Sequence, residues 1–229
     1  LFGVRSADGA MSALSTSRAS SPVEVHLDPA TLAPVAVRYE PDYSRWDVLE
    51  PSHPQGRLLE RLLKTFPGQR VSIRSSTRDG AKSVALVEAD VDPGTFYLVD
   101  RAGEALVPLL RRHEGVNPDE MRPMEAFVIE SRDGLRLHGY LTLPPGGPAS
   151  SPPPMIVLPH GGPHGVRDLW SFDPDAQMFA SQGFAVLQVN FRGSGGYGQD
   201  FVAAGYEQWG RAVQNDILDA LRWAIAEGA

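Results

Sequence analysis

The pattern of apolar residues changes near Asn117-Pro118, and this change constrains the fold more than any other feature of the sequence. Before it, short runs alternate apolar and polar residues between turn-forming residues, which is typical of an antiparallel all-β module. After it, short apolar runs alternate with helix-length amphipathic segments, which favours a parallel, doubly wound α/β sheet. We therefore expect two domains, at residues 1–119 and 120–229.

The first domain contains one clear repeat-sized unit. Strands are expected at 71–77, 83–89, 95–99 and 105–110, with turns at Arg78-Asp79-Gly80, Asp92-Pro93-Gly94 and Arg101-Ala102-Gly103. Four strands in about 40 residues is the size of one β-propeller blade. An earlier hairpin, at 23–27 and 34–39, fits the preceding blade. A short amphipathic helix at 57–64, ended by Pro67-Gly68, would be an insertion between blades.

The second domain begins with a hairpin and continues with alternating strands and helices. The hairpin is expected at 125–130 and 135–143, across Arg132-Asp133-Gly134, and a loop rich in Pro, Gly and Ser follows at 144–154. Strands buried on both faces are expected at 155–158 and 184–189. The first helix is expected at 173–182, with Gly183 as its stop and with Met178, Phe179 and Ala180 turned inward. The second is expected at 209–227, with one apolar face formed by Val213, Ile217, Leu221 and Ala224.

Composition excludes several classes of function. The formal net charge is −7 and no Lys/Arg run exceeds two residues, so we expect neither a nucleic-acid nor a membrane partner. The chain has no cysteine, which excludes disulfides and Cys-ligated zinc. We also expect no metal and no cofactor, because the histidines lack metal-ligand spacing: His26, His53, His113 and His138 are scattered, and His160 and His164 lie on a Gly/Pro loop.

The first segment whose residues suit catalysis lies at the carboxyl end of an expected strand. It is Leu158-Pro159-His160-Gly161-Gly162-Pro163-His164-Gly165. Ligand crevices of open α/β sheets lie at that edge. Paired glycines let the backbone approach a substrate and turn its amides outward, as the stabilisation of an oxyanion requires. Gly162 is the best candidate donor, with Gly161 beside it. The alternative is a Gly/Pro turn without catalytic duty.

The second segment, Asn190-Phe191-Arg192-Gly193-Ser194-Gly195-Gly196-Tyr197-Gly198, satisfies GxGxxG. A dinucleotide-binding turn is disfavoured, because helix is expected where a second strand should end in an acidic residue. Arg192 and Tyr197 are candidate substrate contacts. The alternatives are that Arg192 holds Asp216 or Asp219 by a bidentate pair, and that Tyr197 serves packing. Asp173 and Asp175 are expected to be helix-capping charges.

Together these segments resemble the prolyl oligopeptidase family, peptidase family S9, and most of all its acylaminoacyl-peptidase and dipeptidyl-peptidase branches. The resemblance rests on HGGPHG at 160–165, QGFAV at 182–186, NFRGSGGYG at 190–198, Phe201, Trp209-Gly210, and Asp216 with Asp219. It implies the end of a β-propeller followed by the amino-terminal half of an α/β-hydrolase domain. It also implies an oxyanion-hole amide at Gly162, with His160 where some relatives place a tyrosine hydroxyl.

The resemblance implies a serine peptidase that hydrolyses short peptides by acyl transfer to water. Such enzymes carry their nucleophile on a GxSxG elbow, followed by Asp and then His, and no GxSxG occurs in these 229 residues. We therefore expect the Ser, Asp and His of the triad to lie outside this chain, which should be inactive alone. The alternatives are an α/β-hydrolase esterase and a non-catalytic, propeller-containing binding protein.

The first residues, Leu1-Phe2-Gly3, indicate an internal piece of a longer protein. A signal peptide upstream is compatible with this interpretation, and we expect a cytoplasmic location. The longer protein is also a candidate homo-oligomer.

Overall fold

The computed structural model describes residues 2–4, 11–17, 19–101, 105–146, 152–162 and 164–229. The chain divides into two compact units. Unit 1 comprises Leu1–Glu88 and Gly94–Glu114, and unit 2 comprises Ala89–Pro93 and Gly115–Ala229. The short segment Ala89–Pro93 therefore belongs to unit 2, although it lies between two strands of unit 1, an arrangement that the sequence did not indicate.

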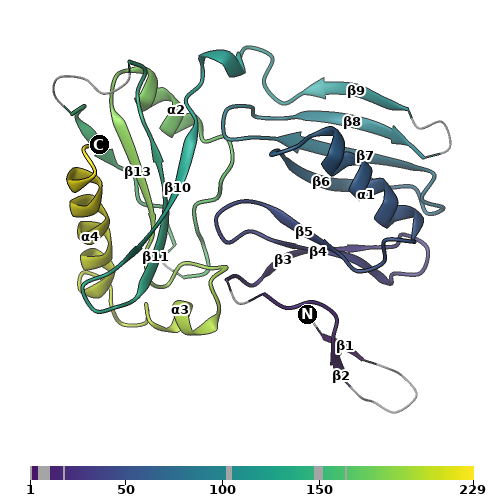
Figure 1. The fold of residues 1–229 in the computed structure, drawn as a ribbon, viewed down its shortest axis with the longest axis horizontal. Coiled ribbons are helices and arrows are strands. Elements are labelled where there is room, and N and C mark those ends of the chain that lie inside the picture. Colours follow the sequence, from purple (N-terminus) through teal and green to yellow (C-terminus); the bar gives the residue numbers. More distant parts are fainter. Residues whose placement is uncertain (1, 5–10, 18, 102–104, 147–151, 163) are drawn as a thin grey trace. The chain divides into compact units, whose positions relative to one another are not determined.

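Unit 1 consists of antiparallel sheets and one helix (Figure 1). The sheets are β1-β2 (Phe2–Val4, Met11–Ala13), β3-β4-β5 (Pro22–Leu27, Pro34–Tyr39, Arg45–Val48) and β6-β7-β8-β9 (Arg70–Ser76, Lys82–Glu88, Thr95–Asp100, Leu106–Arg111). The four-stranded sheet confirms the predicted blade-like meander, with strand ends shifted by one residue or so. Strands β1, β2 and β5 were not predicted. The expected turn at 101–103 and much of the loop at 144–154 lie outside the described residues.

Helix α1 (Pro54–Thr65) forms because its apolar residues recur on one face. The His53 side chain accepts a hydrogen bond from the Gln55 amide at the amino end, where Pro54 occupies a position that needs no N–H donor. Leu58, Leu59 and Leu62 are buried against a core that includes Val71 of β6 and Val87 of β7. The predicted helix is confirmed and is longer than expected at its amino end.

Unit 2 contains one mixed sheet and three α-helices in its described part. Its elements are a 3-10 turn (Pro118–Glu120), β10 (Met124–Glu130), β11 (Arg136–Thr142), β12 (Met155–Val157), α2 (Pro174–Ser181), β13 (Ala185–Asn190), α3 (Gln199–Ala203) and α4 (Ala212–Ala226). The strand order is β10-β11-β13-β12. Only β12 and β13 run parallel, because the β10-β11 hairpin joins the same sheet antiparallel to β13. The expected hairpin and the expected parallel pair are both confirmed, and what was not predicted is that the hairpin joins the sheet of the parallel pair.

Strand β13 is covered on both faces, as its apolar sequence predicted. Leu187 and Val189 pack against α4, together with Phe127 of β10. Their neighbours along the strand point to the opposite face, where Gln188 bonds to Asp173 at the start of α2. Helices α4 and α2 thus lie on the two sides of this strand (Figure 1). Residues 155–157 are only half-buried, because β12 is an edge strand of the described sheet.

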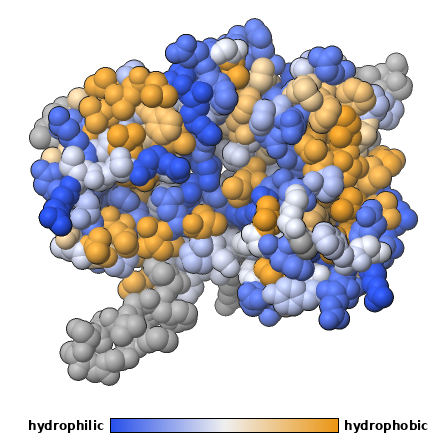
Figure 2. All heavy atoms as spheres, turned by 180° about the vertical axis from the view of Figure 1, so that it is seen from behind, coloured by the Kyte–Doolittle hydropathy of each residue, from blue (hydrophilic) through white to orange (hydrophobic). Residues whose placement is uncertain are grey.

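The face predicted for α2 differs from expectation, whereas Val213 and Ala224 of the face predicted for α4 are buried as expected. Met178 is 50% exposed, and the buried residues of α2 are Ala176, Gln177 and Ala180. Gln177 can be buried because its side-chain amide donates a hydrogen bond to the Arg122 carbonyl oxygen at 2.7 Å. A search for apolar periodicity does not detect a buried polar residue of this kind. Trp209 is 71% exposed and precedes α4. Hydrophobic groups also reach the surface elsewhere, including the side chains of β9, and Figure 2 shows them interspersed with hydrophilic ones.

Candidate functional site

The first glycine loop leaves β12 at the carboxyl end of the strand. Leu158 still donates its amide to Leu187 of β13, at 2.9 Å, and the chain then turns away from the sheet. Gly161 and Gly162 are exposed, and Gly162 has a φ of 136°, a conformation that favours glycine. Neither amide donates a hydrogen bond to another residue of the described chain. The backbone here offers free donors to solvent, as the oxyanion-hole prediction requires. Pro163 lies outside the described residues.

His160 attaches this loop to the second glycine loop. Its Nε2 lies 2.8 Å from the Ser194 hydroxyl, and its ring stacks on Phe191 with centroids 4.4 Å apart. Its Nδ1 lies 2.7 Å from the Gly161 carbonyl oxygen, which can only accept, so Nδ1 carries the proton and Ser194 donates to Nε2. Burial lowers the pKa of His160, which favours this neutral form.

The His160–Ser194 pair has the distance of a nucleophile and its base, but it has a different role. Ser194 is 0% exposed, so no substrate carbonyl can reach its hydroxyl. A third group that orients the base is also missing from the described residues, because Nδ1 faces a backbone carbonyl and not a carboxylate. The pair is a positioning contact. The two residues are 34 positions apart, and no spacing in the sequence indicated it.

The second glycine loop follows β13 and is bonded to the first loop. Gly165 donates to the Gly193 carbonyl oxygen at 3.0 Å, and Gly195 donates to Val166 at 3.1 Å. A Cβ added at Gly195 would lie 2.3 Å from the Gly165 carbonyl oxygen, so only glycine fits there. Glycine serves here to bring two backbones together.

Three successive amides of this second loop donate hydrogen bonds within the protein. Gly193 donates to Phe201, Ser194 to Phe191 and Gly195 to Val166. A dinucleotide-binding turn needs such amides free to face a pyrophosphate at a helix start. The first half of the GxGxxG match therefore has a structural explanation, and the dinucleotide interpretation is left without three of its donors.

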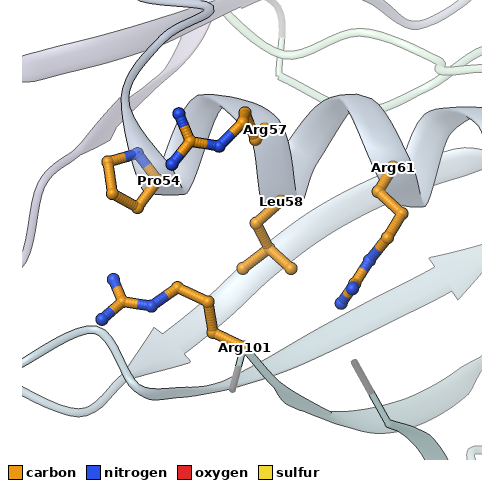
Figure 3. A pocket seen from close by; sticks show the side chains of 5 residues that line it. All are labelled: Pro54, Arg57, Leu58, Arg61 and Arg101. Carbon is orange, nitrogen blue, oxygen red and sulfur yellow. The ribbon is translucent and has the colours of Figure 1, made fainter. Parts of the chain in front are cut away.

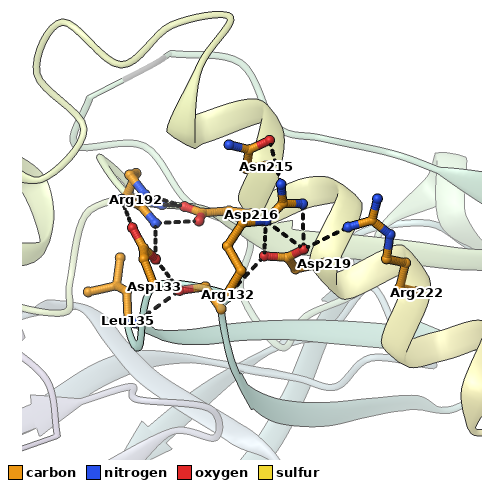
Figure 4. Close-up of polar contacts among 9 residues, drawn as sticks. Arg132, Asp133, Leu135, Arg192, Asn215, Asp216, Asp219 and Arg222 are labelled. Atoms are coloured by element: carbon orange, nitrogen blue, oxygen red, sulfur yellow. Dashed lines mark hydrogen bonds and ion pairs between the residues drawn. The ribbon is translucent and has the colours of Figure 1, made fainter.

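Arg192 is held by two carboxylates (Figure 4). Its Nε and Nη2 donate to the two oxygens of Asp216 on α4, at 2.8 and 2.7 Å, and its backbone amide also donates to Asp216. Its Nη1 and Nη2 donate to Asp133 in the β10-β11 turn, both at 2.8 Å. Four of these bonds come from the five N–H groups of one guanidinium. The expectation that Arg192 holds Asp216 is confirmed.

Electrostatics follow from these contacts. The hydrogen bonds from Arg192 and Ser131 hold the pKa of Asp133 far below its usual range, and the paired carboxylates raise the pKa of Arg192. Asp216 is 0% exposed, so the ion pair to α4 is a buried one. Asp133 and Arg192 are thereby held in their charged forms and are unsuited to proton transfer. Substrate binding by Arg192 stays a prediction, and the observed contacts give it a positioning role.

Asp219 pairs with a different arginine from the one expected. The Arg132 backbone amide and Nε donate to Asp219, both at 3.0 Å, and Nη2 donates at 2.7 Å. Arg132 Nη1 also donates to Asn215 at 3.1 Å. The adjacent residues Arg132 and Asp133 of the hairpin turn are thus both anchored in this cluster, which fixes α4 against the hairpin (Figure 4).

Tyr197 lies within a packed group. Its ring stacks on His138, with centroids 4.4 Å apart, and the Arg167 guanidinium lies 5.2 Å from its centroid. Its hydroxyl accepts a hydrogen bond from Asn190 Nδ2 at 2.8 Å. The packing alternative describes this arrangement, and a substrate contact by Tyr197 stays a prediction.

A buried acid lies beside this group. Asp168 donates its amide to Asn190, at 2.8 Å, while its carboxylate approaches Gln188 Nε2 at 3.4 Å. Burial and the nearby charge of Asp173 raise the pKa of Asp168 to about 7, although the bond from Gln188 opposes the shift. Asp173 caps α2 by accepting from the Asp175 and Ala176 amides, as predicted. No pattern in the sequence had indicated a special role for Asp168.

The remaining histidines do not form a metal site. Among the residues that the structure describes, no three His, Cys, Asp or Glu side chains cluster so as to hold a metal ion. His164 instead meets the Tyr206 ring edge-on, with centroids 4.9 Å apart. None of the helices in the described ranges is long and apolar enough to cross a membrane.

Comparison with known proteins places this arrangement in a family. Residues 170–229 match the model of the prolyl oligopeptidase family. The chain is also 35% identical over 207 residues to dipeptidyl aminopeptidase BIII of Pseudoxanthomonas mexicana, covering 88% of this chain and 30% of that relative. The chain belongs to the prolyl oligopeptidase family. It spans less than a third of the length of this relative.

Solved structures support the same family and confirm the predicted fold class. An acylaminoacyl peptidase of Pyrococcus horikoshii shares 29% identity over 64% of this chain and 23% of its own, with a TM-score of 0.53. A structure from a study of two prolyl endopeptidases covers 99% of this chain and 33% of its own, at 16% identity and a TM-score of 0.71, and so shows the fold alone. The fold is that of the end of a β-propeller joined to the front part of an α/β-hydrolase domain.

Proposed function

We propose that the protein containing this chain is a serine-type peptidase that hydrolyses short peptides by acyl transfer to water. The observation that carries the proposal is the pair of exposed residues Gly161 and Gly162, whose amides are unbonded within the described chain, at the carboxyl end of β12 in a chain of this family. Amides in such a position stabilise the negative charge of a tetrahedral intermediate, because they are oriented before the charge develops. In this proposal residues 1–119 end the propeller and 120–229 begin the catalytic domain.

The proposed division of labour follows from the contacts. Gly162 donates to the oxyanion, with Gly161 beside it, and His160 fixes the loop through Ser194. Arg192 fixes α4 and the second loop. The Ser, Asp and His of a triad are assigned to residues outside this sequence, because no GxSxG elbow occurs in it. The 229-residue chain alone is therefore expected to leave peptides uncleaved.

The test uses the full-length gene product. A fluorophosphonate probe should label it stoichiometrically, and it should release p-nitroaniline from a dipeptidyl or an acylaminoacyl p-nitroanilide. Absence of labelling would favour a non-catalytic binding protein. Labelling with hydrolysis of p-nitrophenyl esters but of no anilide would favour an esterase, and either result would overturn the proposal.

A separate variant tests whether Gly162 donates to the oxyanion. Gly162→Ala should lower kcat by about 100-fold with little change in KM, because a side chain is strained at this φ and displaces the amide. Gly115→Ala is the matched control, since Gly115 lies in a loop with open space around it and has no positive φ. Equal kcat values for the two variants would remove Gly162 from the site.

A further inference from the structure

Unit 1 contains a pocket of about 270 Å³ beside α1, remote in sequence from the two glycine loops. Its lining residues are Pro54, Arg57, Leu58, Arg61 and Arg101. Arg57 and Arg61 are one helical turn apart and share a face of α1. Arg101 follows β8, and its side chain extends under the helix, so that three guanidinium groups surround Leu58 (Figure 3).

Arg57 and Arg61 form no ion pair with a carboxylate among the described residues of the chain, whereas Arg101 interacts electrostatically with Asp79. Their hydrogen bonds go to backbone carbonyl oxygens: Arg57 donates to Ser52, and Arg101 donates to Asp79 at 3.4 Å. Other arginines of the same unit differ, since Arg38 and Arg70 each pair with Glu40. The pocket therefore concentrates three positive charges, of which only that of Arg101 has a carboxylate nearby, in a chain whose net charge is −7.

The chemistry of the lining selects a class of ligand. A guanidinium presents a planar fork of N–H donors that matches phosphate and carboxylate oxygens, and it stays charged at every physiological pH. Three such groups suit the double charge of a phosphomonoester better than the single charge of a carboxylate. The apolar surface of the pocket comes mainly from the half-buried Pro54, because Leu58 is only 4% exposed, and it suits an uncharged organic group. The volume of about 270 Å³ lies just below the roughly 300–1,000 Å³ typical of small-molecule sites, so the pocket suits a small ligand and is too small to enclose a dinucleotide.

We propose that this pocket binds a small organic phosphate, with the guanidinium groups of Arg57, Arg61 and Arg101 on the phosphate and with Pro54 and Leu58 against the organic part. The site belongs to unit 1 and is separate from the proposed oxyanion loop of unit 2. It does not depend on the peptidase proposal, and failure of either proposal leaves the other standing.

The test is calorimetric titration of the full-length gene product with phenyl phosphate, at low ionic strength. Saturable binding at one site is expected. Arg61→Gln and Arg101→Gln should each weaken the Kd by about tenfold or more, because each removes a charge-assisted contact. Arg74→Gln is the matched control: Arg74 is exposed on β6, carries the same charge and does not line the pocket, so its variant should keep the Kd within about twofold. Thermal melting of each variant verifies folding.

Three results would overturn the proposal. One is the absence of saturable binding of phenyl phosphate. Another is a Kd that Arg61→Gln and Arg101→Gln change no more than Arg74→Gln does. The third is benzoate binding as tightly as phenyl phosphate, which would make the pocket a carboxylate site. Binding that is at least about tenfold weaker for benzoate, and that inorganic phosphate displaces, supports the phosphate assignment.

Discussion

The two glycine-rich loops of unit 2 have similar compositions and different functions. Both follow a strand of the same parallel pair, β12 and β13. In the first loop Gly161 and Gly162 are exposed, and their amides are unbonded within the described chain. In the second, residues 191–195 are buried and three successive amides are bonded internally. Glycine therefore presents backbone donors in one loop and permits close backbone packing in the other.

The difference arises from the residues between the glycines. The second loop carries Arg192, whose bonds to Asp133 and Asp216 fix it to two other elements. Among its described residues, the first loop has one side-chain hydrogen bond to the second loop, between His160 and Ser194. The second loop is thus a rigid base on which the first is placed. If this comparison is correct, substitutions in the base should affect stability most, and substitutions in the exposed loop should affect it least.

The largest effect is expected for Asp216→Ala. This substitution leaves the Arg192 guanidinium buried without its main partner, and breaking one side of a buried ion pair costs about 3–5 kcal/mol. The measurement is the free energy of unfolding of the full-length gene product in urea. Asp219→Ala is the matched control, because its partner Arg132 is about half exposed and such pairs contribute roughly 1 kcal/mol or less. A loss for Asp216→Ala no greater than for Asp219→Ala would remove the second loop from its role as the base.

Asp168 is expected to have a smaller effect on the free energy of unfolding, and this effect depends on pH. The residue lies just after the first loop, and its amide donates to Asn190 at the start of the second loop. Its pKa is raised to about 7, so the folded state binds a proton that the unfolded state has already released. Its contribution to stability is therefore present below about pH 4 and is lost as the pH rises through 7. Between pH 5 and 8 the loss should be about 2–3 kcal/mol.

Asp168→Asn removes this titration and should flatten the pH dependence of the unfolding free energy, making the variant more stable than the parent at pH 8. Asp175→Asn is the control, because Asp175 is an exposed residue of the first turn of α2. It should keep the parent's slope. If the unfolding free energy of Asp168→Asn depended on pH as steeply as that of the parent, Asp168 would not be the group that keeps its proton in the folded state.

Local sequence patterns predicted most of the elements. The blade-like strands, the Arg132-Asp133-Gly134 turn, helix α1 and the Asp173 cap each depend on residues close together in the chain, whose periodicity and turn chemistry are visible in the sequence. The mixed sheet was not predicted, because β11 pairs with β13 over about 50 residues and no local pattern encodes that pairing. The short helix α3 was missed because five residues contain too little periodicity.

The parts of the candidate site that depend on backbone conformation were predictable from the sequence. The glycines at 161, 162, 193 and 195 mark their loops directly, and Arg192 with Asp216 was inferred as a pair. Contacts between side chains distant in sequence were not predictable, as in the pairing of His160 with Ser194 and of Arg132 with Asp219. The raised pKa of Asp168 likewise comes from burial, which only the fold determines.

A still smaller effect is expected where the two loops touch. A Cβ at position 195 would lie 2.3 Å from the Gly165 carbonyl oxygen, so Gly195→Ala must push the loops apart at a cost of about 1–3 kcal/mol. At Gly161 an added Cβ meets nothing within 4 Å, and Gly161→Ala should change the unfolding free energy by less than about 0.5 kcal/mol. Equal losses in the two variants would mean that the loops can separate freely or that the first is also tightly packed.

The smallest effect concerns the link between His160 and Ser194. A double-mutant cycle of His160→Ala and Ser194→Ala should give a coupling energy of about 1 kcal/mol, the net contribution of one buried hydrogen bond. Ser194→Ala alone should also lower kcat of the full-length gene product without abolishing fluorophosphonate labelling, because a positioning hydroxyl orients the Gly162 loop and is not the nucleophile. Complete loss of labelling would make Ser194 the reacting serine, which its burial argues against. A coupling energy near zero would mean that the exposed loop is held by its backbone bonds to Gly193 and Gly195 alone.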